Sequence, residues 1–119
     1  MTVICVDDER LQVEYVAELC LSLDNVDEAK GFTKPFEVLE YLEQEPADLA
    51  LLDIDMPGMN GIELAEAIRE RHPYLPIIFL TGYPQYTMDA LQVHASGYLL
   101  KPVKKEKLAT EVAYAIGSV

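Results

Sequence analysis

Residues 47–61, ADLALLDIDMPGMNG, combine a continuous apolar run with two carboxylates that follow it at once. An apolar run without alternation is typical of a strand that is buried on both faces of a parallel sheet. Asp53 and Asp55 stand at the end of this run, just before the turn signal of Pro57 and Gly58. Carboxylates are almost never fully buried without a partner. The stretch therefore predicts a buried strand whose acidic end is compensated by groups from elsewhere in the chain.

Apolar runs alternate with amphipathic stretches along the whole chain. We predict strands over residues 2–6, 26–32, 47–54, 75–81 and 97–100. We predict helices over residues 9–23, 33–45, 61–71, 86–95 and 104–116. The first helix is expected to bury a face made of Leu11, Tyr15, Val16, Leu19 and Cys20. Five repeats of strand then helix, with continuously apolar strands, predict a doubly wound α/β sandwich.

The composition excludes several classes of function. The chain has 119 residues, half of them hydrophobic, and a formal net charge of -12. This length fits one domain, and the charge would repel a phosphate backbone, so we do not expect direct binding of nucleic acid. The longest apolar run is too short for a bilayer and the N-terminus has no signal-peptide pattern, so we expect a cytoplasmic location without membrane contact. Cys5 and Cys20 occupy apolar positions and are expected to be free thiols.

Polar side chains stand at the ends of four predicted strands. They are Asp7, Asp8, Asp53, Thr81 and Lys101. In an open parallel sheet, ligands bind beyond the carboxyl ends of the strands, so these groups should meet in one crevice. Like charges this close need a cation, and Lys101 and a hard divalent ion such as Mg²⁺ both suit. A carboxylate nucleophile beside a metal is the arrangement that phosphoryl transfer needs.

Each of these residues also has an ordinary structural explanation. Asp8 could cap the first helix while Asp7 is solvated in a turn. Asp53 could close a strand at the surface, and Asp55 could begin a turn. Thr81 could belong to a turn before Gly82, and Lys101 could be a surface lysine. The agreement of four independent strand ends favours a common site.

Four motifs resemble, in order and spacing, the signature of the receiver domain of bacterial two-component response regulators. They are VDDE (6–9), LLDIDMPGMNGIEL (51–64), FLTG (79–82) and GYLLKPV (97–103). The resemblance covers essentially all of residues 1–119 as one domain, and it implies a three-layer (βα)5 flavodoxin-like fold with five parallel strands in the order 2-1-3-4-5. Residues 6–16 and 81–103 look most like receivers that precede LytTR-type DNA-binding domains, so any C-terminal output domain is expected to lie outside this chain.

The resemblance implies a role for each residue of the predicted site. Asp53 would accept a phosphoryl group from a sensor histidine kinase, Thr81 would hydrogen-bond to the phosphoryl oxygens, and Lys101 would pair with them. Mg²⁺ or Mn²⁺ would be held by Asp7, Asp8, Asp53 and the backbone carbonyl of Asp55. The chain would therefore be a signalling switch and not an enzyme, apart from transferring the phosphoryl group to itself and losing it by hydrolysis.

The same resemblance implies how the signal leaves the site. Tyr98 would turn inward when Thr81 moves, and the face made by residues 86–95, 97–100 and 104–116 would change, favouring homodimerisation and control of a transcriptional output. The side chain of Asp55, together with Tyr83, would tune how fast water reaches the phosphoaspartate. The bond from Lys101 to Pro102 would be cis, since X-Pro is where a cis bond costs least.

Three alternatives differ in their chemistry. A haloacid-dehalogenase-type phosphatase would share the apolar strand followed by Asp-x-Asp, but Pro57 stands where Thr or Val is usual, and the motif lies on the third strand instead of the first. A pseudo-receiver would keep the fold without the chemistry. An FMN-binding flavodoxin would need a phosphate-cradling loop after the first strand, where this chain has acids.

Overall fold

The computed structural model describes residues 1–82 and 95–117. In this part of the chain five strands form one sheet: β1 (Thr2–Val6), β2 (Glu28–Phe32), β3 (Leu49–Asp53), β4 (Ile77–Thr81) and β5 (Gly97–Leu100). All neighbouring strands are parallel, and their order is β2-β1-β3-β4-β5. The predicted flavodoxin-like sheet is confirmed, although three of its strands begin two residues later than predicted.

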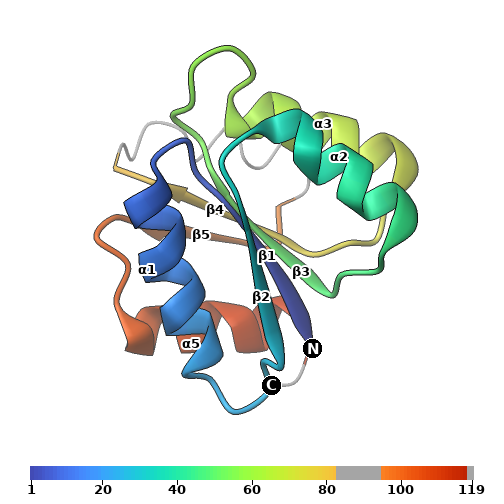
Figure 1. The fold of residues 1–119 in the computed structure, drawn as a ribbon. Helices are drawn as coiled ribbons and strands as arrows, with labels where there is room; N and C mark the ends of the chain where they lie inside the picture. Colours follow the sequence, from blue (N-terminus) through green and yellow to red (C-terminus); the bar gives the residue numbers. More distant parts are fainter. Residues whose placement is uncertain (83–94, 118–119) are drawn as a thin grey trace.

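Helices cover both faces of the sheet and make the three layers seen in Figure 1. They are α1 (Arg10–Leu21), α2 (Pro35–Gln44), α3 (Gly61–Arg71) and α5 (Lys105–Ala115). α2 and α3 pack on one face, and α1 and α5 pack on the other. The predicted helix over residues 86–95 lies almost entirely outside the described residues. None of the four described helices is long and apolar enough to cross a membrane.

The central strands are apolar throughout because both of their faces are buried. Every residue of β3 and of β4 is buried. Within β3, Ala50 and Leu52 pack toward α2 and α3, whereas Leu49 and Leu51 pack toward α1 and α5. This accounts for the continuous apolar run, because an alternating pattern would leave one face exposed.

The buried face of α1 agrees in part with the predicted one. Three of the five predicted residues are buried or half-buried: Val16, Leu19 and Cys20. The other two were wrong, since Leu11 is 78% exposed and Tyr15 is 45% exposed, and Val13 is buried in their place. All of these positions fit helical spacing, so periodicity alone does not choose between them. The neighbouring strand decides: a Cβ at Gly31 of β2 would lie only 2.4 Å from a methyl carbon of Val13. Val13 fills the space that this glycine leaves open.

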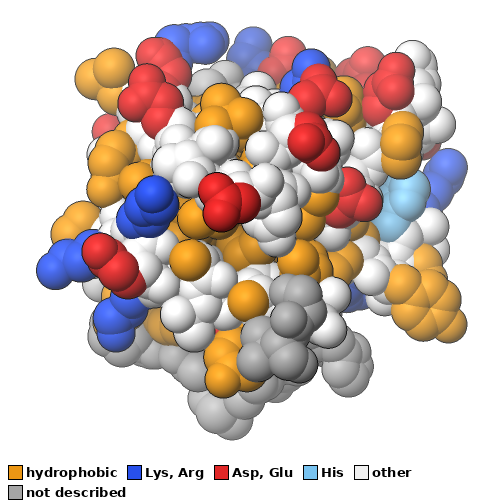
Figure 2. Space-filling view, turned by 90° about the horizontal axis from the view of Figure 1, so that it is seen from below, with side chains coloured by type: hydrophobic (Ala, Val, Ile, Leu, Met, Phe, Trp, Pro, Cys, Tyr) orange, Lys and Arg blue, Asp and Glu red, His pale blue; other side chains and the backbone are white. Residues whose placement is uncertain are grey.

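The first turn of α5 carries a cluster of positive charge on an otherwise acidic protein. Four of the nine basic residues fall between positions 101 and 107, and Lys104, Lys105 and Lys107 are exposed. Figure 2 shows Lys and Arg side chains gathered at the left of the face that is seen from below, where α5 begins. Two large hydrophobic side chains are also exposed on this part of the chain: Leu100 at the end of β5 and Tyr114 near the end of α5.

Gly61 allows α3 to begin directly against β3. A Cβ at this position would lie 2.1 Å from the carbonyl oxygen of Asp53, and that oxygen is held in the backbone of a central strand. We expect Gly61→Ala to lower the free energy of unfolding by about 1–3 kcal/mol, measured by urea denaturation, because the backbone must shift to admit the methyl group. Gly82→Ala is the matched control, since no residue that the structure describes lies within 4 Å of a Cβ there. Equal stability of the two variants would contradict this close approach.

Candidate functional site

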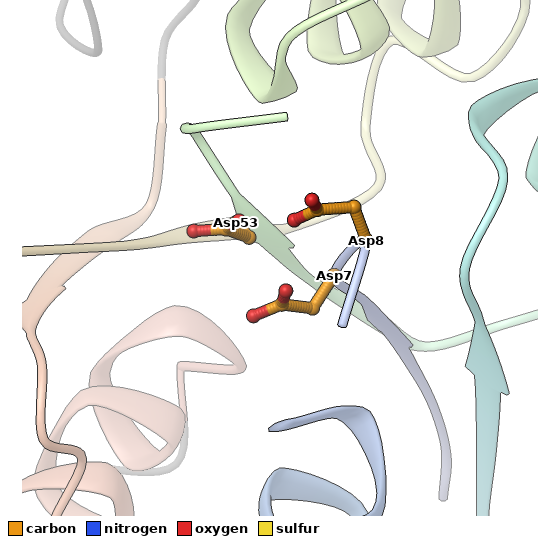
Figure 3. A group of neighbouring side chains, drawn as sticks. All are labelled: Asp7, Asp8 and Asp53. Carbon is orange, nitrogen blue, oxygen red and sulfur yellow. The ribbon is translucent and has the colours of Figure 1, made fainter. Parts of the chain in front are cut away.

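Three carboxylates meet at the carboxyl ends of β1 and β3. One oxygen of each of Asp7, Asp8 and Asp53 lies within 4.8 Å of the others, and Figure 3 shows the three side chains pointing to the same side of the sheet. Asp7 and Asp53 are buried, whereas Asp8 is exposed to solvent. The sheet therefore brings together the acidic residues that the sequence predicted to meet, with one side of the cluster open.

The turn after β1 fixes the two acids at its end. The backbone N–H of Asp7 donates to the carbonyl of Phe32 on β2 at 3.2 Å. The Asp7 Oδ1 in turn accepts from the backbone N–H of Glu9 at 3.0 Å. Glu9 is the N-cap residue of α1 and makes no side-chain cap. The alternative that Asp8 serves to cap α1 is therefore wrong, and its carboxylate is free to face the cluster.

Lys101 supplies the positive charge inside the site. Its Nζ lies 2.9 Å from Asp7 Oδ2 and 2.9 Å from Asp53 Oδ1. Burial lowers the pKa of Lys101, but the two carboxylates outweigh it and the pKa is raised above its usual value. The backbone N–H of Lys101 donates to the Thr81 carbonyl at 2.7 Å, and the following bond to Pro102 is cis. One ammonium thus serves two buried carboxylates.

The acidic cluster is under-compensated without a further cation. Burial raises the pKa of Asp53 to about 6, against the opposing ion pair with Lys101, and the carboxylates of Asp7 and Asp55 add to the rise. Desolvation and the neighbouring Asp7 also raise the pKa of Asp8. Although Asp53 Oδ1 lies at ion-pair distance from Lys101, this buried oxygen accepts no well-directed hydrogen bond from the described residues 1–82 and 95–117. The cluster therefore offers three carboxylate oxygens, and the Asp53 oxygen among them has room for another ligand. Such a set of oxygens suits a hard divalent cation.

Thr81 ends β4 beside this cluster, and its side chain is fully buried. The Thr81 hydroxyl donates to Asp55 Oδ2 at 3.0 Å. The sequence had indicated Thr81 as a site residue but not this hydrogen bond. Asp55 follows β3, and Thr81 is the last residue of β4. Their places at the ends of two predicted strands are the only signal in the sequence that could have suggested the contact.

Tyr98 and Tyr83 are the two aromatic residues that were predicted to act in the switch or to tune it. Tyr98 of β5 is half-buried, lies opposite Phe79 of β4 in the sheet register and packs against the core between the sheet and the α2 and α3 layer. Tyr83 lies outside the described residues. The structure thus brings six of the predicted site residues together at the carboxyl ends of the strands, whereas Tyr98 lies within β5. The six are Asp7, Asp8, Asp53, Asp55, Thr81 and Lys101.

Residues 3–113 match the family model described as the response regulator receiver domain. The chain belongs to this family. The positive alginate biosynthesis regulatory protein of Pseudomonas aeruginosa is 38% identical over 110 residues, which are 92% of this chain and 44% of that protein. The sensory transduction protein LytT of Enterococcus faecalis is 36% identical over 120 residues, covering 97% of this chain and 48% of that protein. The receiver thus spans less than half the length of these two relatives, and LytTR-type regulators are among its homologues.

Solved structures of receivers have the same fold. A chemotaxis protein of Vibrio cholerae superimposes with a TM-score of 0.87 at 25% identity, covering 96% of this chain and 97% of that chain. The response regulatory domain of protein mrkE from Klebsiella pneumoniae gives a TM-score of 0.87 at 25% identity, over 99% of this chain and 97% of that chain. The order of strands in the sheet and the acidic cluster at its end are therefore those of a receiver.

Removal of the Asp53 charge should stabilise the protein when no divalent cation is present. The pKa of Asp53 is about 6 in the folded protein and about 4 in an unfolded chain. The folded state therefore binds more protons between these values, and the free energy of unfolding falls as the pH rises through this window. Across this window, the raised pKa lowers the free energy of unfolding by at most about 3 kcal/mol. We expect Asp53→Asn to exceed the wild type in stability at pH 7.5 by up to this amount, and to match it near pH 4.

Urea denaturation in EDTA at several pH values measures this difference. Asp24→Asn, which changes an exposed acid between α1 and β2, is the matched control. A stability difference between wild type and Asp53→Asn that does not change with pH would contradict the raised pKa.

Proposed function

We propose that this chain is a phosphorylation-dependent switch that accepts a phosphoryl group on Asp53 from a sensor histidine kinase in the cytoplasm. The observation that carries the proposal is a buried carboxylate held 2.9 Å from Lys101 and beside two further acids. Membership of the receiver family supports it, because receiver domains partner with sensor histidine kinases. A buried ion pair of this kind would add little to stability by itself, so a chemical role explains it better than a structural one.

The proposed cofactor is Mg²⁺, with Mn²⁺ as a substitute. The side chains of Asp7, Asp8 and Asp53 would hold it, together with the backbone carbonyl of Asp55. The fit rests on the three carboxylate oxygens within 4.8 Å and on the buried Asp53 oxygen, which accepts no well-directed hydrogen bond within the part of the chain that the structure describes. When bound, the ion would neutralise the charge of the phosphoryl oxygens, which is its usual contribution to phosphoryl transfer.

The chain's own residues would carry out the transfer. With a pKa of about 6, Asp53 is mostly ionised at pH 7 and can act as a nucleophile. Its carboxylate oxygen attacks the phosphorus, a new O–P bond forms, and the P–N bond to the donor's imidazole breaks with the electron pair leaving on nitrogen. Lys101 then pairs with the phosphoryl oxygens and Thr81 donates its hydroxyl to one of them. Asp55 and Tyr83 would tune the access of water to the product.

The proposed output face consists of residues 86–95, β5 and α5. Movement of Thr81 toward the phosphoryl group would let Tyr98 turn inward, which biases a two-state element by a local change in charge. Leu100 of β5 and Tyr114 of α5 are exposed, which makes this face a suitable surface for a second copy of the chain. We propose that phosphorylation favours a homodimer through it.

The proposed output is transcriptional. The Pseudomonas relative is named as a positive regulatory protein of alginate biosynthesis, and the matched receiver is 44% of its length. We propose that residues 1–119 act as a receiver domain that controls a DNA-binding output domain of the LytTR type, with no DNA contact made by the receiver itself.

Incubation with acetyl phosphate and Mg²⁺ should add one phosphoryl group, measured by intact-protein mass spectrometry. Asp53→Asn should give no adduct because the nucleophile is missing, and EDTA should suppress the reaction of the wild type. Asp24→Asn should be labelled as the wild type is. Labelling of Asp53→Asn at another residue would contradict the assignment. A wild type that neither forms an adduct nor binds beryllofluoride would be a pseudo-receiver.

A further inference from the structure

The Thr81 hydroxyl is already engaged in the structure. It donates to Asp55 Oδ2 at 3.0 Å. β3 and β4 are adjacent, with Asp53 opposite Leu80 in the register, so the residues that follow β3 lie beside the end of β4. Thr81 is fully buried and Asp55 is half-buried. This hydrogen bond is thus set by the pairing of two central strands and is partly shielded from water.

A threonine hydroxyl has one proton to donate. A phosphoryl oxygen on Asp53 and the carboxylate of Asp55 would both be charged acceptors for it, and hydrogen bonds to charged acceptors are roughly twice as strong as neutral ones. The two acceptors therefore compete for the same donor. The hydroxyl cannot turn to a phosphoryl group until its hydrogen bond to Asp55 has been broken.

We infer that the Asp55 carboxylate is a positioning residue that holds the Thr81 hydroxyl in the resting conformation and so opposes the activated one. The inference rests on the proposed function of Asp53 as phosphoryl acceptor. It gives the Asp55 side chain a role in the conformational equilibrium, separate from any effect on the access of water. Loss of this acceptor makes the activated conformation easier to reach, both with and without the phosphoryl group.

Beryllofluoride with Mg²⁺ serves as the probe, and the affinity is measured by titration of the full chain. Asp55→Asn and Asp55→Ala both remove one negative charge, but only Asn keeps an oxygen that can accept from Thr81. We expect Asp55→Ala to bind beryllofluoride about 3- to 10-fold more tightly than Asp55→Asn, which is the size of one hydrogen bond. Equal affinities of the two variants would overturn the inference and leave Asp55 acting through its charge alone. Tighter binding by Asp55→Asn would also overturn it.

The second comparison removes the donor. In a Thr81→Val background, Asp55→Asn and Asp55→Ala should bind beryllofluoride alike, because there is no hydroxyl left to hold. A difference that persists in this background would show that Asp55 acts on another group and would overturn the inference. The comparison is a double-mutant cycle, which isolates the coupling of the two side chains from their separate effects.

The third readout needs no ligand. The Lys101 N–H donates to the Thr81 carbonyl at 2.7 Å, so its amide resonance reports on the end of β4. In the unliganded protein, Asp55→Ala should move this resonance toward its position in the beryllofluoride complex further than Asp55→Asn does.

If the wild type neither forms the acetyl phosphate adduct nor binds beryllofluoride, the proposed function fails. The contact is then decided by urea unfolding of the Thr81→Val, Asp55→Ala and double variants. Non-additive shifts of the midpoint support the contact, and additive shifts refute it.

Discussion

The Lys101 ammonium, shared by Asp7 and Asp53, is the interaction on which the site depends. It lies 2.9 Å from an oxygen of each carboxylate, and both acids are buried. Without it, two ionised groups would lie side by side in a poorly solvated place, where repulsion would neutralise one of them. With it, Asp53 still has a pKa raised to about 6. The site therefore holds a deficit of positive charge that a metal ion can meet.

The fold explains why this charge arrangement can exist at all. A parallel sheet places the carboxyl ends of its strands at one edge, and the order β2-β1-β3-β4-β5 puts the ends of β1, β3 and β4 next to one another. Gly61 allows the start of α3 to lie against the carbonyl of Asp53. The apolar residues buried in β3 and β4 stabilise the sheet. The polar residues at the strand ends can then be placed for the reaction and not for stability.

Much of this was predictable because buried parallel strands and strand-end acids leave strong signals. The run from Leu49 to Asp53 and the carboxylates that end it predicted both the sheet and the site. The buried face of α1 was predicted only in part: Val13 was missed, because several positions fit helical spacing and the absence of a side chain at Gly31 selects Val13. The hydrogen bond from Thr81 to Asp55 was also missed, since it depends on the register of two strands and not on local spacing.

The dependence of stability on Mg²⁺ shows whether the acidic cluster lacks positive charge. At pH 7.5, titration with Mg²⁺ should raise the thermal unfolding midpoint of the wild type in a saturable way, because a ligand that binds only the folded state stabilises it. Asp8→Asn should weaken this dependence, since it removes one of the three carboxylates and leaves the ion pairs of Lys101 in place. Asp24→Asn should respond as the wild type does. A wild-type midpoint that is unchanged by Mg²⁺, or an equal response in Asp8→Asn, would contradict the account.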